Sequence, residues 1–83
     1  MDKVALLGRG EEPRDALGFV KALMEASDLG GSEAMGAMYE LFDTRTPLRG
    51  PVRIPLKADA DAADFARRCA EHGISATVQD AWP

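Results

Sequence analysis

The sequence contains one cysteine, one histidine, one tryptophan and one tyrosine in 83 residues. A single cysteine excludes a disulfide framework and a cysteine-based zinc site within one chain. A single histidine excludes the double-histidine motifs and most histidine-rich metal sites. We therefore expect neither a metal nor a cofactor.

Long apolar runs are missing as well. The run over residues 4–7 is far shorter than the ~18 residues that a membrane span requires, and the N-terminal segment is too short for a secretory signal. Basic residues are in the minority, since ten Lys and Arg stand against fourteen Asp and Glu to give a net charge of −4. This balance disfavours nucleic acid as a partner. We expect a cytoplasmic protein with no membrane partner.

The remaining composition is that of a folded domain. Apolar residues make up 46% of the chain and charged residues 29%, which is too apolar for a disordered segment. A chain of this length forms one domain with a small core. We therefore predict a single domain over residues 1–83.

Hydrophobic periodicity divides the chain into six elements. Short or alternating apolar segments predict strands, and apolar residues at helical spacing predict helices. In chain order we expect a strand over 4–7, a helix from Pro13 to Ser27, a helix capped by Ser32 and reaching Phe42, a strand over 52–56, a helix capped by Asp59 or Asp61 and closed by Gly73, and a strand over 74–79. This β-α-α-β-α-β order predicts an α+β fold, a two-layer sandwich with a three-stranded antiparallel sheet and the helices on one face.

The segment 43–56 has an unusual pattern, three tandem copies of Arg-x-Pro-apolar that read RTPL, RGPV and RIPL. Its prolines exclude a helix and confine any strand to a sheet edge. In an extended chain the period of two places four basic residues on one face: Arg45, Arg49, Arg53 and Lys57. Such a cationic ridge is typical of RNA or anion binding, and equally of an edge strand protected against aggregation.

The first predicted helix carries more apolar surface than one packing face requires. Its expected core face comprises Ala16, Phe19, Val20 and Leu23. Leu17 and Met24 widen this face, and Lys21 borders the extension. The added surface is either a partner-binding site, where methionine adapts to varied contacts, or further core of a small protein. Trp82, in the tail over 80–83, is either a lid on the core or a partner anchor.

Two groups of residues superficially resemble a metal-binding site and a catalytic pair. The aspartates at positions 59, 61 and 64 lack the spacing of a calcium loop and are typical of a helix start, where they cap the helix and complement its dipole. Cys69 and His72 lie one turn apart, but Cys69 belongs to an apolar stripe, where a thiol stays protonated and inert. We therefore predict a protein without catalytic or metal-binding residues, and not an enzyme.

Residues 19–35, FVKALMEASDLGGSEAM, resemble the helical hairpin in the C-terminal domain of the bacterial ribosomal stalk protein. That family reads V-I-K-A-V-R, a short spacer and T-G-L-G-L-K-E-A-K. The positions that match it here are Val20, Lys21, Ala22, Leu23, Leu29, Gly30, Glu33 and Ala34. Residues 61–79, DAADFARRCAEHGISATVQ, are similar to the family's last helix and strand. The resemblance implies the same order of elements.

The stalk domain presents a cationic, partly apolar hairpin face to translation GTPases. The resemblance places the corresponding face here on Leu17, Val20, Lys21, Met24 and Met35. Of these residues only Lys21 carries a charge, so we do not expect a working stalk protein. What the resemblance implies is a non-enzymatic module that binds another protein, with a translation GTPase or another cytosolic complex as the partner.

The Clp protease adaptor that delivers N-degron substrates shares this order of elements, and our sequence is similar to it in its long second strand. That adaptor needs an Asn-Asp pair just after the first strand, where Gly8 and Arg9 stand here. A cation at this position repels the α-amino group of such a substrate. The alternative that stays open is therefore an adaptor-like protein that does not recognise N-degrons.

Overall fold

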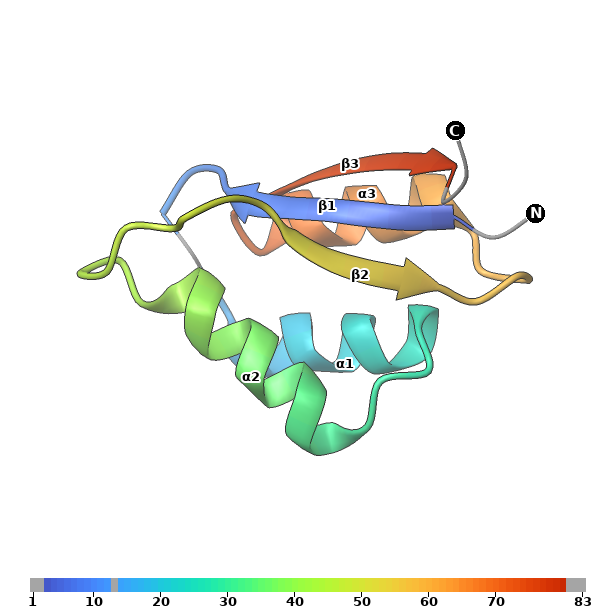
Figure 1. Ribbon diagram of the computed structural model, residues 1–83, viewed down its shortest axis with the longest axis horizontal. Coiled ribbons are helices and arrows are strands. Elements are labelled where there is room, and N and C mark those ends of the chain that lie inside the picture. Colours follow the sequence, from blue (N-terminus) through green and yellow to red (C-terminus); the bar gives the residue numbers. More distant parts are fainter. Residues whose placement is uncertain (1–2, 13, 81–83) are drawn as a thin grey trace.

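The computed structural model describes residues 3–12 and 14–80. Its elements are β1 (Lys3–Arg9), α1 (Ala16–Ala26), α2 (Gly31–Phe42), β2 (Val52–Leu56), α3 (Ala62–Glu71) and β3 (Ile74–Asp80). The strands form one antiparallel sheet in the order β2-β1-β3. Helices α1 and α3 cover one face of this sheet, and α2 packs against α1 (Figure 1). The predicted α+β fold is confirmed, and no helix within the described ranges is long and apolar enough to cross a membrane.

The predicted edge strand is confirmed over Val52–Leu56. Ile54 and Leu56 are buried against the helices, whereas Arg53 and Pro55 are exposed. β3 alternates in the same way, with Ile74 buried and its neighbour Ser75 exposed. β1 lies between these two strands and is longer than predicted. It continues through Gly8 to Arg9 because both residues still pair with β3.

The start of α1 differs from the sequence prediction. The helix begins at Ala16 rather than near Pro13, a residue outside the described ranges, so Glu11 and Glu12 precede the helix and are not part of its first turn. Asp15 is the N-cap, and its carboxylate accepts a hydrogen bond from the Gly18 N–H at 3.1 Å. Asp15 has a φ of 51°, in the left-handed region, so the helix cannot extend further toward the N-terminus.

The ends of the other two helices test three predicted signals. The prediction that Ser32 caps α2 is wrong, because the helix begins at Gly31 with Gly30 as an N-cap that makes no side-chain hydrogen bond. The prediction that Asp61 caps α3 is confirmed by the Asp64 N–H, which donates to the Asp61 carboxylate at 3.0 Å. Gly73 follows α3 with a φ of 78°, a left-handed conformation that favours glycine and turns the chain into β3.

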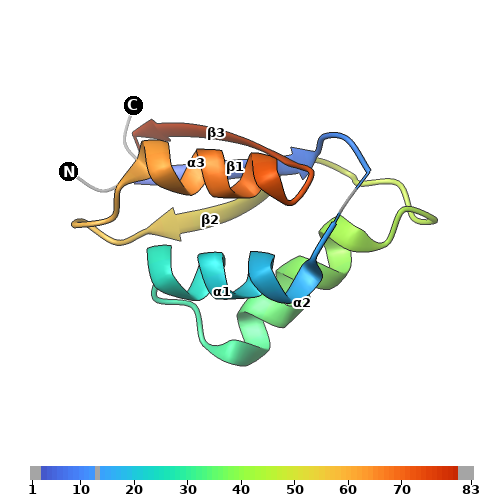
Figure 2. The same cartoon turned by 180° about the vertical axis from the view of Figure 1, so that it is seen from behind.

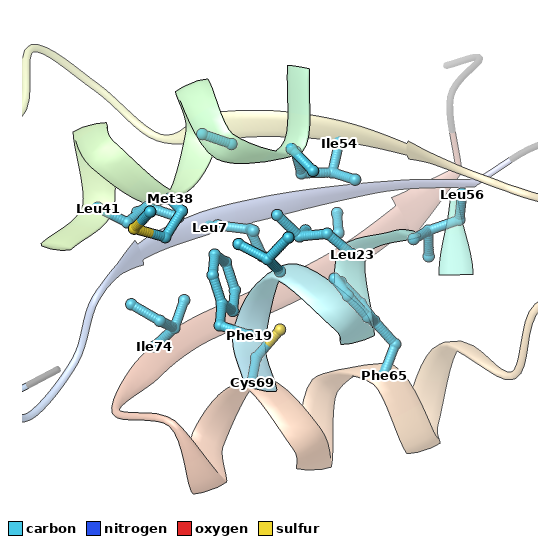
Figure 3. Packing of buried hydrophobic residues seen from close by; sticks show 14 residues of the cluster. Leu7, Phe19, Leu23, Met38, Leu41, Ile54, Leu56, Phe65, Cys69 and Ile74 are labelled. Carbon is cyan, nitrogen blue, oxygen red and sulfur yellow. The ribbon is translucent and has the colours of Figure 1, made fainter. Parts of the chain in front are cut away.

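The core lies between the sheet and the helices (Figure 3). Its fully buried apolar side chains come from every layer of the fold: Leu7, Phe19, Leu23, Leu41, Phe65, Cys69 and Ile74. The ring of Phe19 lies 5.6 Å from that of Phe42, which joins α1 to the end of α2. This core uses the inner face of α1 and leaves Leu17 and Met24 outside.

Candidate functional site

The exposed large apolar side chains of the described residues all lie on the α1–α2 hairpin. Leu17 is 70% exposed, Met24 44% and Tyr39 64%. Leu17, Lys21 and Met24 follow one another at intervals of four and three residues, so they form one stripe along α1. Lys21 is exposed in the middle of this stripe. The outer side of α1 therefore presents a cation between two apolar side chains.

Helix α2 contributes two further residues to the hairpin. The contact between Phe19 and Phe42 shows which flank of α2 faces α1. Met35 lies two turns before Phe42 on that flank and is partly buried against the core. Tyr39 lies one turn after Met35 and is exposed. We call Leu17, Lys21, Met24, Met35 and Tyr39 the hairpin patch.

The structure changes the predicted binding face at two positions. Val20 is 8% exposed and belongs to the core cluster, so it supports α1 from inside and offers little contact surface. Tyr39, which is 64% exposed, was not among the predicted site residues. Its spacing of four residues from Met35 places both residues on one side of α2, which is the signal that could have added Tyr39 to the predicted face.

One ion pair holds α1 in place against α3. The Arg68 guanidinium donates to the Glu25 carboxylate, and this hydrogen bond is the main cause that raises the pKa of Arg68. Glu25 follows Met24 directly but points toward α3 because of this contact. Lys21 consequently supplies the exposed charge of the stripe on α1.

A groove of about 740 Å³ lies next to the hairpin, between the end of α2 and the Arg-x-Pro segment. Arg49 and Arg53 line it, together with the apolar side chains of Leu48 and Val52. Tyr39 also lines the groove, so this tyrosine belongs both to the groove and to the hairpin patch. The groove combines these apolar walls with charges of both signs, because Glu40 and Asp43 line it as well.

Arg9 closes one end of the groove and is engaged with the protein backbone. Its guanidinium donates to the carbonyl of Leu41 at 3.0 Å, to that of Glu40 at 2.8 Å and to that of Asp43. These are carbonyls at the end of α2, which have no partner within the helix and lie at the negative end of its dipole. The cation at this position therefore stabilises the end of α2.

The four basic residues of the predicted ridge are not placed as one row. Arg49 and Arg53 lie together at the groove, and Arg45 is not among the residues that line it. Lys57 lies at the other end of β2, in a hollow that also contains Asp59 and the other aspartates at the start of α3. The arrangement brings together two of the four cations, and acidic side chains surround Lys57.

The charge of Arg45 is compensated locally. Its Nε lies 3.7 Å from the Asp43 carboxylate, and its side chain is 94% exposed. The Thr46 hydroxyl donates to the same carboxylate at 2.9 Å. This hydrogen bond, with a further one from the Arg45 backbone N–H, lowers the pKa of Asp43. Asp43 thus stays ionised and shapes the turn after α2.

Cys69 and His72 do not form a nucleophile–base pair. Cys69 is fully buried, and its burial raises the pKa of the thiol to about 12. The His72 backbone N–H donates to the Cys69 carbonyl at 3.0 Å. The His72 imidazole lies toward α1 instead, with its Nδ1 4.0 Å from a carboxylate oxygen of Asp15. Cys69 is protonated at neutral pH and acts as a core residue.

We expect Cys69 in the folded protein to react with a disulfide reagent at about pH 8 at least ~100-fold more slowly than in urea, because labelling requires the core to open. The folded pKa of about 12 lies above the ordinary value of 9.0. The free energy of unfolding is therefore unaffected by this thiol below pH 9 and falls as the pH rises from 9 toward 12. Labelling rates, and urea titrations on both sides of pH 9, measure both effects. Rapid labelling without urea would contradict this burial.

Within residues 3–12 and 14–80, no group of three or more His, Cys, Asp or Glu side chains is arranged to hold a metal ion. The candidate site in this part of the chain comprises the hairpin patch and the adjoining groove. Comparison of the chain with protein-family models, curated protein sequences and solved structures finds no match in any of the three.

Proposed function

We propose that this protein is a non-enzymatic interaction module of the cytoplasm, which binds a partner protein through the hairpin patch. The observation that carries the proposal is that Leu17, Met24 and Tyr39, the exposed large apolar residues of the described chain, all lie on one hairpin. Scattered exposed apolar residues are ordinary, but a contiguous set marks an interaction surface. The remainder of the apolar surface of α1 is used by the core.

The patch also indicates the chemistry of the partner. Leu17, Met24 and Tyr39 offer apolar contacts, and methionine adapts its shape to the surface that it meets. Lys21 pairs with a carboxylate. An amphipathic helix with an acidic residue beside its apolar stripe fits these requirements. The resemblance to the ribosomal stalk domain points to translation GTPases as the first partners to test.

We expect the double variant Lys21→Glu/Met24→Asp to lose affinity for its partner by at least about 30-fold, which corresponds to about 2 kcal/mol. Both side chains are exposed, so circular dichroism and the melting temperature should stay unchanged. Calorimetric titration of purified translation GTPases measures the affinity. Equal affinities of the variant and the unaltered protein would remove the hairpin patch from consideration, and no binding to any translation GTPase would remove that class of partner.

The matched control is Arg49→Glu/Arg53→Glu, which makes charge changes of similar size outside the hairpin patch. We expect this control to bind the partner as the unaltered protein does. The control also addresses the second candidate function, anion binding in the groove, which is favoured because Arg49 and Arg53 line it together. Loss of binding in the control alone would favour the groove over the hairpin.

A further inference from the structure

The two edges of the sheet differ in how they are protected. On β2, Pro55 has no N–H to offer to a further strand. The next outward donor, the Lys57 N–H, is already bonded to the carbonyl of Ala26 at 2.9 Å, and Ser27 forms a bridge with Leu56. The last turn of α1 therefore lies against this edge and leaves little of it open.

The pairing of β1 shows which backbone groups face outward on β3. Because a proline has no N–H, the pair Val4–Pro55 is a non-hydrogen-bonded one, and Val4 directs its N–H and C=O toward β3. The Gly10 N–H agrees with this pattern, since it donates to the Gly73 carbonyl at 3.1 Å. The residues of β3 that direct both backbone groups away from β1 are therefore Ile74, Ala76, Val78 and Asp80.

β3 lacks the features that protect an edge. Its seven residues read ISATVQD, without proline, lysine or arginine, and with no charge before Asp80. Its register with β1 runs without interruption from Ile74 to Asp80, so no bulge disrupts it. In the described part of the chain no further strand pairs with its outer side. A long, regular and uncharged edge is a template for another strand.

Helix α3 leaves room beside this edge. Its Arg68 faces α1, and the opposite side carries three small side chains at helical spacing: Ala63, Ala66 and Ala70. Ala70 lines a shallow hollow with Ile74 and Ser75, which places this side next to β3. Arg67 is the large residue nearby, and its guanidinium is already neutralised by Asp64 and Glu71 at 2.6 Å each. This side of α3 therefore offers small side chains and an arginine that is already paired to a second helix alongside it.

We propose that β3 pairs antiparallel with β3 of a second copy of this chain, about a twofold axis at Thr77, to form one continuous sheet. This register pairs every outward residue of β3. It sets Thr77 opposite Thr77 and Ser75 opposite Gln79 on the open face of the sheet, and Ala76 opposite Val78 on the helix face. The central pairs match polar with polar and apolar with apolar side chains, the outermost pair sets Ile74 opposite Asp80, and no like charges face each other.

The occupant that fits this edge is a second copy of the chain, because the strand can pair with itself. Residues 74–79 carry no charge that would attract a charged peptide of another protein. A twofold interface requires the same surface to match itself, and the pairing about Thr77 does so. The α1–α2 hairpin, which carries the patch, lies nearer to the β2 edge of the sheet than to β3 (Figure 2). Dimerisation therefore leaves the patch free, and the two proposals can fail independently.

Thr77→Lys and Thr77→Glu each place two like charges at the twofold axis, so we expect each variant to weaken the dimer at least about 10-fold. An equimolar mixture of the two should restore it as a heterodimer. Sedimentation velocity on the unaltered protein up to about 200 μM gives the reference, and Arg53→Glu, on the open face of β2, is the matched control that should stay dimeric. A monomeric unaltered protein, or dimers of both single variants, would overturn the proposal.

Cysteine cross-linking tests the register separately. Non-hydrogen-bonded antiparallel pairs have Cα atoms about 4.5 Å apart, within the range of a disulfide. Thr77→Cys should therefore form a covalent dimer on mild oxidation, whereas Ser75→Cys should not, since the proposed register places it opposite Gln79. The native Cys69 is buried and does not compete. Cross-linking of Ser75→Cys but not of Thr77→Cys would contradict the register.

Discussion

Replacing Phe19 with alanine is expected to lower the free energy of unfolding by about 3–5 kcal/mol. The side chain is fully buried and packs against Phe42 at the junction of α1 and α2. A domain of 83 residues has a total stability of about 4–12 kcal/mol. The loss therefore amounts to at least about a quarter of the total stability, and the variant should unfold at a clearly lower urea concentration than the unaltered protein.

Leu17→Ala is the matched control, because Leu17 lies on the same helix but is 70% exposed. We expect its free energy of unfolding to change by no more than about 0.5 kcal/mol. Urea titrations followed by circular dichroism measure both variants. If Leu17→Ala were as destabilising as Phe19→Ala, Leu17 would be part of the core and the hairpin patch would lose its first residue.

The elements of this fold could be predicted because their signals are local. Residues 74–79 alternate between apolar and polar as a half-buried strand requires, and Asp61 and Gly73 are placed where α3 needs a cap and a turn. Pro55 indicated an edge strand because proline has no N–H to donate to a neighbouring strand. In each case one residue type has one physical role, and the structure bears it out.

Features that depend on contacts distant in sequence could not be predicted in this way. α1 begins after Asp15, which caps the helix in a left-handed conformation, whereas the sequence prediction took Pro13 as the first residue of the helix. The position of Tyr39 on the outer flank of α2 follows from how α2 packs on α1, and spacing alone leaves the direction open. Val20 was assigned to the core face by its spacing and to the binding face through a resemblance, and its burial confirms the assignment to the core.

Arg9 is another residue whose contacts, distant in the sequence, could not be predicted. In the sequence it appears as a cation after a strand, and its partners are carbonyls of Glu40, Leu41 and Asp43, about thirty residues away. The last carbonyls of a helix need donors from elsewhere. That α2 obtains them from the end of β1 follows from the packing of α2 beside the sheet. The guanidinium thus joins the sheet to the hairpin.

Arg9→Ala is accordingly expected to lower the free energy of unfolding by about 2–3 kcal/mol, since hydrogen bonds from a charged donor contribute about 1.5–3 kcal/mol each and this site is partly exposed to water. Amide hydrogen exchange should accelerate most in the last turn of α2. Arg9→Lys separates two causes, because lysine keeps the charge at the helix end but lacks the planar fork that reaches several carbonyls. We expect it to recover less than half of the loss. If Arg9→Lys recovered the full loss, charge alone would stabilise the end of α2. If Arg9→Ala left the free energy of unfolding unchanged, water would donate to these carbonyls as well as the guanidinium does.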